Sequence, residues 1–180
     1  MSQLQLAYEI ARAEKGVHEI GGVKHNERIL AYHQATRLKA QADEVSWCSA
    51  FVNWCYVQAG LLLDRASMNY MVRERGLDLD ALDNAGLGDE FAALNEVVSA
   101  REPTFSALAR SWLDWGKETS DPKPGDIVVL KRGSSVWQGH VGFFVKRDLL
   151  TVTVYGGNQA DEVRESRFLR VSVLGYRTES

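Results

Sequence analysis

Residues 46–60 read Ser-Trp-Cys-Ser-Ala-Phe-Val-Asn-Trp-Cys-Tyr-Val-Gln-Ala-Gly, and the rest of the chain is organised around this stretch. Its apolar residues cover more than one side of a helix, which predicts a buried helix that begins near Cys48. We expect Gly60 to end it, because glycine adopts the left-handed conformation of a helix C-terminus without a steric penalty. A cysteine in the first helical turn faces unpaired backbone N–H groups and the positive end of the helix dipole, which favour the thiolate. Cys48 is therefore a candidate nucleophile, although an isolated buried cysteine is more often a packing residue.

The composition predicts one soluble globular domain. The chain has 180 residues, of which 45% are hydrophobic, and this is enough for a single core. The net charge of -3 gives no electrostatic basis for binding nucleic acid. No apolar run approaches the length of a membrane span, so we expect no membrane insertion. Residues 1–6 lack the basic start and apolar centre of a signal peptide, which predicts that the protein is first located in the cytoplasm.

The two cysteines, Cys48 and Cys55, stand seven residues apart on the predicted helix. At a rise of 1.5 Å per residue their Cα atoms would be about 10 Å apart, which is too far for a disulfide. The chain holds no further cysteine and no pair of histidines with the spacing of a zinc site. We therefore expect no metal site, and nothing in the sequence implies an organic cofactor.

The first two thirds of the chain have helical patterns. Capping residues, glycines and apolar spacing predict core helices at residues 2–14, 26–38, 48–60 and 107–115. Residues 61–103 differ, because they are highly charged and their apolar stripes are narrow. We interpret them as a helical insertion with short helices at residues 67–75, 78–84 and 89–100.

After Pro122 and Pro124 the pattern takes the two-residue period of β-strands. Runs rich in β-branched residues predict strands at 126–131, 140–146, 150–155 and 170–176. The short connections between them imply antiparallel pairing. Helices followed by such a meander predict an α+β fold, with residues 1–180 forming a single domain.

Two polar residues near the predicted strands stand out as partners for a catalytic thiol. Thiol catalysis requires a base beside the sulfur and a polar group that orients the base. His140 opens an apolar strand, and Asn158 follows the end of the next strand. In an antiparallel pair these two positions lie close together, so the Asn158 oxygen can accept a hydrogen bond from one imidazole nitrogen. The other three histidines fit solvent-facing or locally bonded positions.

Four short segments occur in a characteristic order: WCSAFV at residues 47–52, PGDIVV at 124–129, GHVGF at 139–143 and GGNQ at 156–159. Together they resemble the CHAP and NlpC-type branch of papain-like cysteine peptidases, and most closely its small phage endolysins. This resemblance implies a papain-like fold in which N-terminal helices pack on a C-terminal antiparallel sheet. It covers most of the chain except residues 61–103.

The resemblance also implies roles for individual residues. Cys48 would be the nucleophile, His140 the base and Asn158 the residue that orients the base. Many CHAP domains have glutamine immediately before the cysteine, where it helps to bind the oxyanion, but this chain has Trp47 there. Ser46, Trp47 and Gln159 are the candidates for oxyanion or substrate contacts.

The implied function is that of an endolysin, a hydrolase that cuts an amide bond in or next to the stem peptide of peptidoglycan. Such a protein would be a monomer that stays in the cytoplasm of the infected bacterium until it is released to the cell wall. Three alternatives remain open at this point. One is an interbacterial amidase effector with the same chemistry, and the second is a papain-like acyltransferase or deamidase. The third is a non-catalytic wall-binding module that stacks sugars on Trp112, Trp115 and Trp137, although such residues are more often core.

Overall fold

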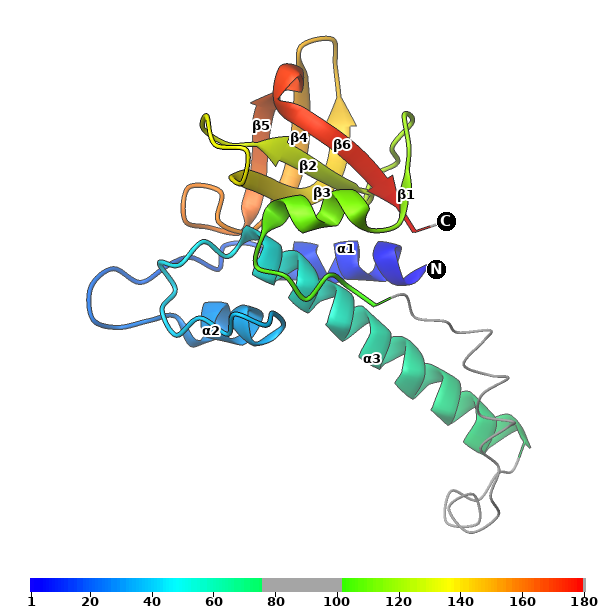
Figure 1. Ribbon diagram of the computed structural model, residues 1–180. Helices are drawn as coiled ribbons and strands as arrows, with labels where there is room; N and C mark the ends of the chain where they lie inside the picture. Colours follow the sequence, from blue (N-terminus) through cyan, green and yellow to red (C-terminus); the bar gives the residue numbers. More distant parts are fainter. Residues whose placement is uncertain (76–101, 180) are drawn as a thin grey trace.

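The computed structural model describes residues 1–75 and 102–179 (Figure 1). Three helices, α1 (Gln3–Ala13), α2 (Glu27–Gln34) and α3 (Cys48–Arg75), lie on one side of a six-stranded sheet. A 3-10 helix, η1 (Ala109–Asp114), lies between α3 and the sheet. This arrangement confirms the predicted α+β architecture with N-terminal helices packed on a C-terminal sheet.

The sheet is antiparallel throughout, and its strand order is β1-β6-β2-β3-β4-β5. Its strands are β1 (Lys117–Glu118), β2 (Ile127–Lys131), β3 (Gly139–Arg147), β4 (Thr151–Gly156), β5 (Arg164–Leu169) and β6 (Val173–Thr178). A short 3-10 turn, η2 (Arg170–Ser172), joins β5 to β6. The four predicted strands are present as β2, β3, β4 and β6. The very short β1 was not predicted, and neither was β5.

Strand β5 was not predicted, because its sequence has no apolar run. It reads Arg-Glu-Ser-Arg-Phe-Leu and alternates between exposed and half-buried residues at the edge of the sheet. Charged side chains are common on edge strands, where they discourage pairing with other chains. Backbone pairing with β4 over all six residues therefore defines this strand, whereas its side chains give little signal.

Helix caps explain where α1 and α2 begin. The Ser2 hydroxyl accepts a hydrogen bond from the Gln5 N–H at 3.2 Å, and Asn26 Oδ1 accepts one from the Arg28 N–H at 2.9 Å. Each bond satisfies a backbone donor that the helix itself leaves unpaired. Both starts were predicted, but α2 ends at Gln34, earlier than expected. The helix predicted at residues 107–115 is the 3-10 helix η1.

The prediction that the Cys48 helix ends at Gly60 is wrong, because α3 continues without interruption to Arg75. The reason lies in packing. A Cβ atom at Gly60 would come within 2.9 Å of Gln3 Nε2, and that nitrogen donates to the Tyr56 carbonyl at 3.0 Å. The missing side chain thus lets α1 approach α3 closely. The helix predicted at 67–75 is the end of α3, whereas those at 78–84 and 89–100 lie outside the described residues.

The core lies between the helices and one face of the sheet, and a smaller cluster covers the other face. Alternation along β2 separates the two, since Ile127 and Val129 face the helices while Val128 and Leu130 face away. His140 pairs with Leu130 across β2 and β3, at the end of the sheet where α3 begins. This position brings the imidazole beside the start of α3.

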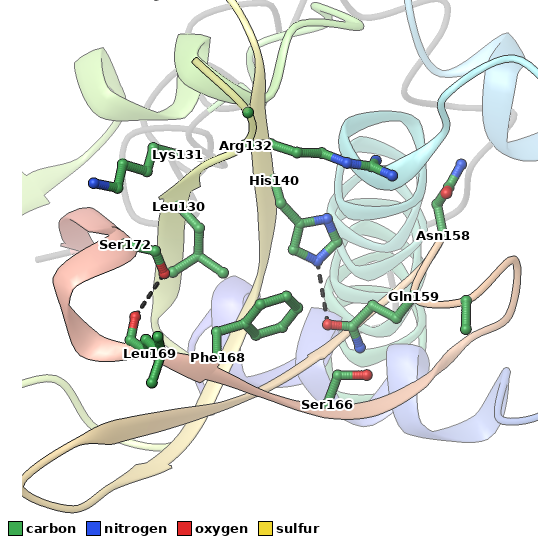
Figure 2. Close-up of a pocket in the computed structure, with 12 residues that line it drawn as sticks. Leu130, Lys131, Arg132, His140, Asn158, Gln159, Ser166, Phe168, Leu169 and Ser172 are labelled. Atoms are coloured by element: carbon green, nitrogen blue, oxygen red, sulfur yellow. Dashed lines mark hydrogen bonds between the residues drawn. The ribbon is translucent and has the colours of Figure 1, made fainter. Parts of the chain in front are cut away.

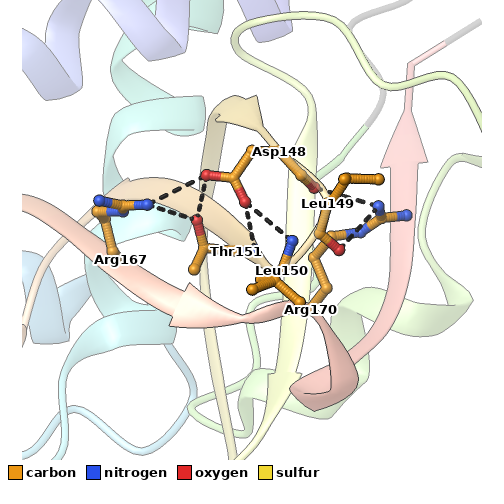
Figure 3. Close-up of polar contacts among 6 residues, drawn as sticks. All are labelled: Asp148, Leu149, Leu150, Thr151, Arg167 and Arg170. Atoms are coloured by element: carbon orange, nitrogen blue, oxygen red, sulfur yellow. Dashed lines mark hydrogen bonds and ion pairs between the residues drawn. The ribbon is translucent and has the colours of Figure 1, made fainter.

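The turn between β3 and β4 lies at the end of those strands away from His140, and a carboxylate holds it (Figure 3). Asp148 accepts hydrogen bonds from the N–H groups of Leu150 and Thr151 at 2.9 and 2.8 Å and from Thr151 Oγ1 at 2.7 Å. These bonds lower the pKa of Asp148 to about 2. Arg167 on β5 pairs with the same carboxylate at 3.1 Å, and Arg170 donates to the Asp148 carbonyl. The turn is thereby joined to the edge strand.

Candidate active site

Cys48 is the first residue of α3, and its side chain is only 2% exposed. Burial alone raises the pKa of this thiol, since it disfavours the charged form. The hydrogen bond and charge of His140, together with backbone hydrogen bonds from Val141 and Ser49, lower the pKa by more. The net result is a pKa below the ordinary value of a cysteine. Cys48 is therefore a buried thiol whose surroundings favour the nucleophilic thiolate.

His140, near the start of β3, is the side chain that most lowers the pKa of the Cys48 thiol. Its side chain is buried, and its ring lies 5.3 Å from the ring of Phe168 on β5. His140 Nε2 lies 3.2 Å from Gln159 Oε1, as Figure 2 shows. The hydrogen bond with the thiol is therefore left to Nδ1. The structure brings Cys48 and His140 together from sequence positions 92 residues apart.

Gln159 fixes which imidazole nitrogen carries the proton. Its amide NH₂ group donates to the carbonyls of Val154 and Gly156 at 3.3 Å each, and also to that of Arg164. Three acceptors around the nitrogen require the amide oxygen to point the other way, toward His140. Because an oxygen can only accept, His140 Nε2 carries the hydrogen and Nδ1 keeps its lone pair. This tautomer is the one that can take the proton of the thiol.

The expected contact between His140 and Asn158 is not the one that the structure shows, because Gln159 takes that place. Asn158 lines the same pocket as His140, but its amide serves Trp47. With the amide oxygen facing the indole, it accepts from Trp47 Nε1 at 3.2 Å and from the Trp47 backbone N–H at 3.1 Å. The left-handed backbone of Asn158, with φ 57°, turns the two adjacent amides in different directions.

Trp47 is fully buried, so its side chain cannot contact substrate as the sequence suggested. The indole Nε1 also donates to Glu19 at 2.7 Å. A Cβ atom at Gly157 would lie 2.3 Å from the indole ring, so only glycine fits where the turn after β4 meets this side chain. Trp47 and Asn158 therefore join the start of α3 to the end of β4.

Two hollows flank the pair formed by Cys48 and His140. The nucleophile cleft, of about 340 Å³, is lined by Ser46, Cys48, Leu108 and Trp137 among others. The imidazole pocket, of about 470 Å³, is lined by His140 and by other residues that include Leu130, Gln159 and Phe168 (Figure 2). Arg132 lines both hollows. The two hollows therefore leave space for a ligand on either side of Cys48 and His140.

Ser46 is the one predicted oxyanion candidate whose side chain is exposed in the nucleophile cleft beside Cys48. Trp47 is buried, and the Gln159 amide is bonded to His140 and to backbone carbonyls. The sequence missed Arg132 because a single arginine after a strand gives no signal on its own. It also did not predict the contact between Gln159 and His140, since spacing cannot separate two adjacent amides.

The tryptophans differ sharply in exposure. Trp112 and Trp115 are buried in the core, and Trp112 Nε1 donates to Ser49 Oγ at 3.1 Å. Neither can stack on a sugar, which removes two of the three residues on which the wall-binding alternative was based. Trp137 is 75% exposed and lines the nucleophile cleft.

Within residues 1–75 and 102–179, no group of three or more histidine, cysteine, aspartate or glutamate side chains is arranged to hold a metal ion. In the same ranges, none of the helices combines the length and the apolar character needed to cross a membrane.

Comparison with known proteins gives one family. The model of the CHAP domain matches residues 40–158, a span that includes Cys48 and His140 and ends immediately before Gln159. No curated protein and no solved structure matches the chain significantly. CHAP domains are typically cysteine hydrolases or peptidases, and the match supports activity related to peptidoglycan. Since 119 of the 180 residues are matched, the chain belongs to the CHAP family.

Proposed function

We propose that this protein is an endolysin-type peptidoglycan hydrolase that cuts an amide bond in or next to the stem peptide. The observation that carries the proposal is the connected series Cys48, His140 and Gln159, in which Gln159 fixes the imidazole tautomer that can receive the thiol proton. A nucleophile, a base and an orienting group in this order are the requirements of thiol acyl transfer.

The first half-reaction begins with attack of the Cys48 thiolate on the amide carbonyl carbon. The carbonyl π bond opens, and its electron pair becomes the oxyanion. As the oxyanion collapses, the C–N bond breaks and His140 gives its Nδ1 proton to the leaving nitrogen. An amine leaves, and the acyl group remains on Cys48 as a thioester.

The second half-reaction returns the enzyme to its starting state. His140 Nδ1 takes a proton from water, and the resulting hydroxide attacks the thioester carbon. The C–S bond breaks, the acid product departs, and the proton on His140 restores the thiol–imidazole pair. No step needs a metal or an organic cofactor.

Backbone groups at the start of α3 support stabilisation of the oxyanion. The first N–H groups of a helix have no partner within the helix, and that of Cys48 belongs to this set. The Ser46 hydroxyl, exposed in the nucleophile cleft, is the second donor that we propose in place of the glutamine of other CHAP domains. One such donor is commonly worth about 3 kcal/mol in the transition state.

The biological setting that we propose is lysis of a phage-infected bacterium. The protein would act as a monomer on the cell wall after release from the cytoplasm, and its only macromolecular partner would be peptidoglycan. Residues 61–103 would be an insertion in the single domain that shapes the substrate groove.

The test is digestion of purified sacculi, with products identified by mass spectrometry. We expect soluble fragments with new amine and carboxyl ends, formed by the wild type and not by His140→Ala. Amide bonds that remain intact in and next to the stem peptide after prolonged incubation would refute the hydrolase proposal. Transfer of acyl groups to added amines without hydrolysis would instead point to an acyltransferase. Genes for a holin or for an immunity protein beside the coding sequence would separate an endolysin from a secreted effector.

A further inference from the structure

We propose that Arg132 recognises a carboxylate of the substrate, and that the bond cut is an amide whose leaving amine has a free carboxylate on the adjacent carbon. This inference rests on the proposed function, since it assigns a substrate class to the same site. It narrows the choice of bond, which neither the family nor the catalytic residues determine.

The position of Arg132 is the first reason. It follows the last residue of β2, and it lines both the nucleophile cleft and the imidazole pocket. Figure 2 shows its side chain on the side of the His140 ring opposite Gln159, extended toward Asn158. A group bound by this guanidinium therefore lies between the two hollows, next to the place where the amide must react.

The second reason is that the Arg132 guanidinium has no partner among the described residues. By contrast, Arg110 donates to the carbonyls of Gln138 and Ser135 at 2.8 and 3.2 Å, so its guanidinium holds the loop between β2 and β3. Arg132 makes no hydrogen bond or ion pair with any residue in the described part of the chain. It is exposed, and its donors are available to a ligand. Arginine presents these donors as a planar fork that matches a carboxylate.

The charge of the imidazole pocket is the third reason. Among the described residues that line it, the charged ones are Lys131 and Arg132, and no carboxylate is present. Lys131 points away from His140 in Figure 2, so Arg132 is the cation near the reacting groups. The apolar side chains of Leu130 and Phe168 complete the pocket. Such a lining favours an anionic group attached to an apolar stem and disfavours a second cation.

The direction of the substrate follows from the mechanism. Cys48 lines the nucleophile cleft and keeps the acyl fragment, whereas His140 lines the imidazole pocket and protonates the leaving nitrogen. The amine fragment is therefore beside Nδ1, on the side of the His140 ring opposite Gln159, where Arg132 lies. Arg132 lies where it would meet a carboxylate one carbon from that nitrogen. A bond to an amino acid with a free carboxylate fits this site, and a bond to a residue whose carboxyl is already in an amide does not.

The experiment uses two synthetic cross-linked stem peptides, in which a D-alanine carbonyl is bonded to one amine of diaminopimelate. In the first peptide the carboxyl beside that amine is free, and in the second it is a carboxamide. We expect the wild type to cleave the free acid with a kcat/KM about 10- to 100-fold higher, as for loss of a charged hydrogen bond. Arg132→Gln should remove this preference, mainly through a higher KM for the free acid.

The control variants separate a specific role from a general effect of charge. Arg132→Lys should keep part of the preference, because it retains the charge without the fork. Lys146→Gln removes the same charge from an exposed position of β3 outside both hollows and should change nothing. Alkylation of Cys48 by iodoacetamide should proceed at the same rate in Arg132→Gln and in the wild type, which shows that the catalytic pair is intact.

The outcomes distinguish this inference from the proposed function. Equal rates on the two peptides, or an Arg132→Gln variant that still prefers the free acid, would overturn the inference alone. Release from sacculi of amines whose adjacent carboxyl is in an amide would do the same. If the wild type digests neither sacculi nor peptides, the proposed hydrolase function fails. If free-acid amines are released and Arg132→Gln slows that release, the inference is supported.

Discussion

Cys48 and Cys55 lie on the same helix and both are buried. Yet the pKa of the Cys48 thiol is lowered and that of the Cys55 thiol is raised, relative to an ordinary cysteine. Burial raises the pKa of Cys55 well above its usual value, and the nearby carboxylate of Glu14 adds to the effect. Cys48 has a lowered pKa in spite of its burial, because His140 and backbone N–H groups favour the thiolate. The comparison shows that burial does not make a thiol reactive. The pKa depends on whether the helix begins at the thiol and on which strand begins beside it.

The largest difference between the two cysteines is expected when each sulfur is removed in turn. Cys48→Ala should reduce the hydrolysis of sacculi by at least about 10⁴-fold, as expected for loss of a nucleophile. Cys55→Ala should keep nearly full activity and lose about 1 kcal/mol of stability, because it only leaves a small gap in the core. Turbidity loss and thermal unfolding measure the two quantities. Equal loss of activity in both variants, with both folded, would contradict the assignment of the nucleophile.

The difference between the two thiols depends on an imidazole ring that Gln159 holds in one tautomer. Substitution of Gln159 should therefore have a smaller effect on activity than loss of the Cys48 sulfur. Gln159→Ala should lower kcat by about 10²-fold with little change in KM, since the base keeps its place but not its orientation. Asn158→Ala should lower kcat by less than about 10-fold and reduce the melting temperature, because it loses the bonds to Trp47 and places alanine at a φ of 57°. The opposite ranking of the two variants in kcat would return the orienting role to Asn158.

The smallest effect is a shift in the pH dependence of alkylation. A lowered pKa means that the Cys48 thiolate persists at lower pH, so its reaction with iodoacetamide should have a midpoint below that of a free cysteine. In His140→Ala the midpoint should move upward, because the side chain that most strongly favours the thiolate is gone. Cys55, with a raised pKa and no exposed surface, should react only after unfolding. Peptide mapping by mass spectrometry follows both sites, and a midpoint unaffected by His140→Ala would show that another group activates Cys48.

The fold was largely predictable from sequence because its signals are local. Ser2 and Asn26 are caps whose side chains bond within three residues, and the apolar alternation of β2 separates two faces. The errors arose where tertiary packing overrides a local preference. Gly60 has the chemistry of a helix end but serves close contact with Gln3, and β5 is a strand only because β4 pairs with it.

The candidate site was partly predictable for the same reason. Cys48 and His140 could be proposed because the start of a helix and the start of a strand are positions that a sequence reveals. The choice between Asn158 and Gln159 could not be made, because it depends on one left-handed residue in a turn. Only the structure gives the directions in which two neighbouring amides point.

The bond between Gln159 and His140 Nε2 has a consequence for the order of events. With that nitrogen occupied, every proton that the imidazole exchanges must enter and leave at Nδ1. In the proposed mechanism, the thiol, the departing amine and the hydrolytic water therefore use a single position, and they must do so one after another. Water can be activated only after the amine has left the edge of the ring. An amine that stays there would compete with water for the thioester. The lifetime of the first product in the site would then determine how often the proposed enzyme resynthesises the bond that it has cut.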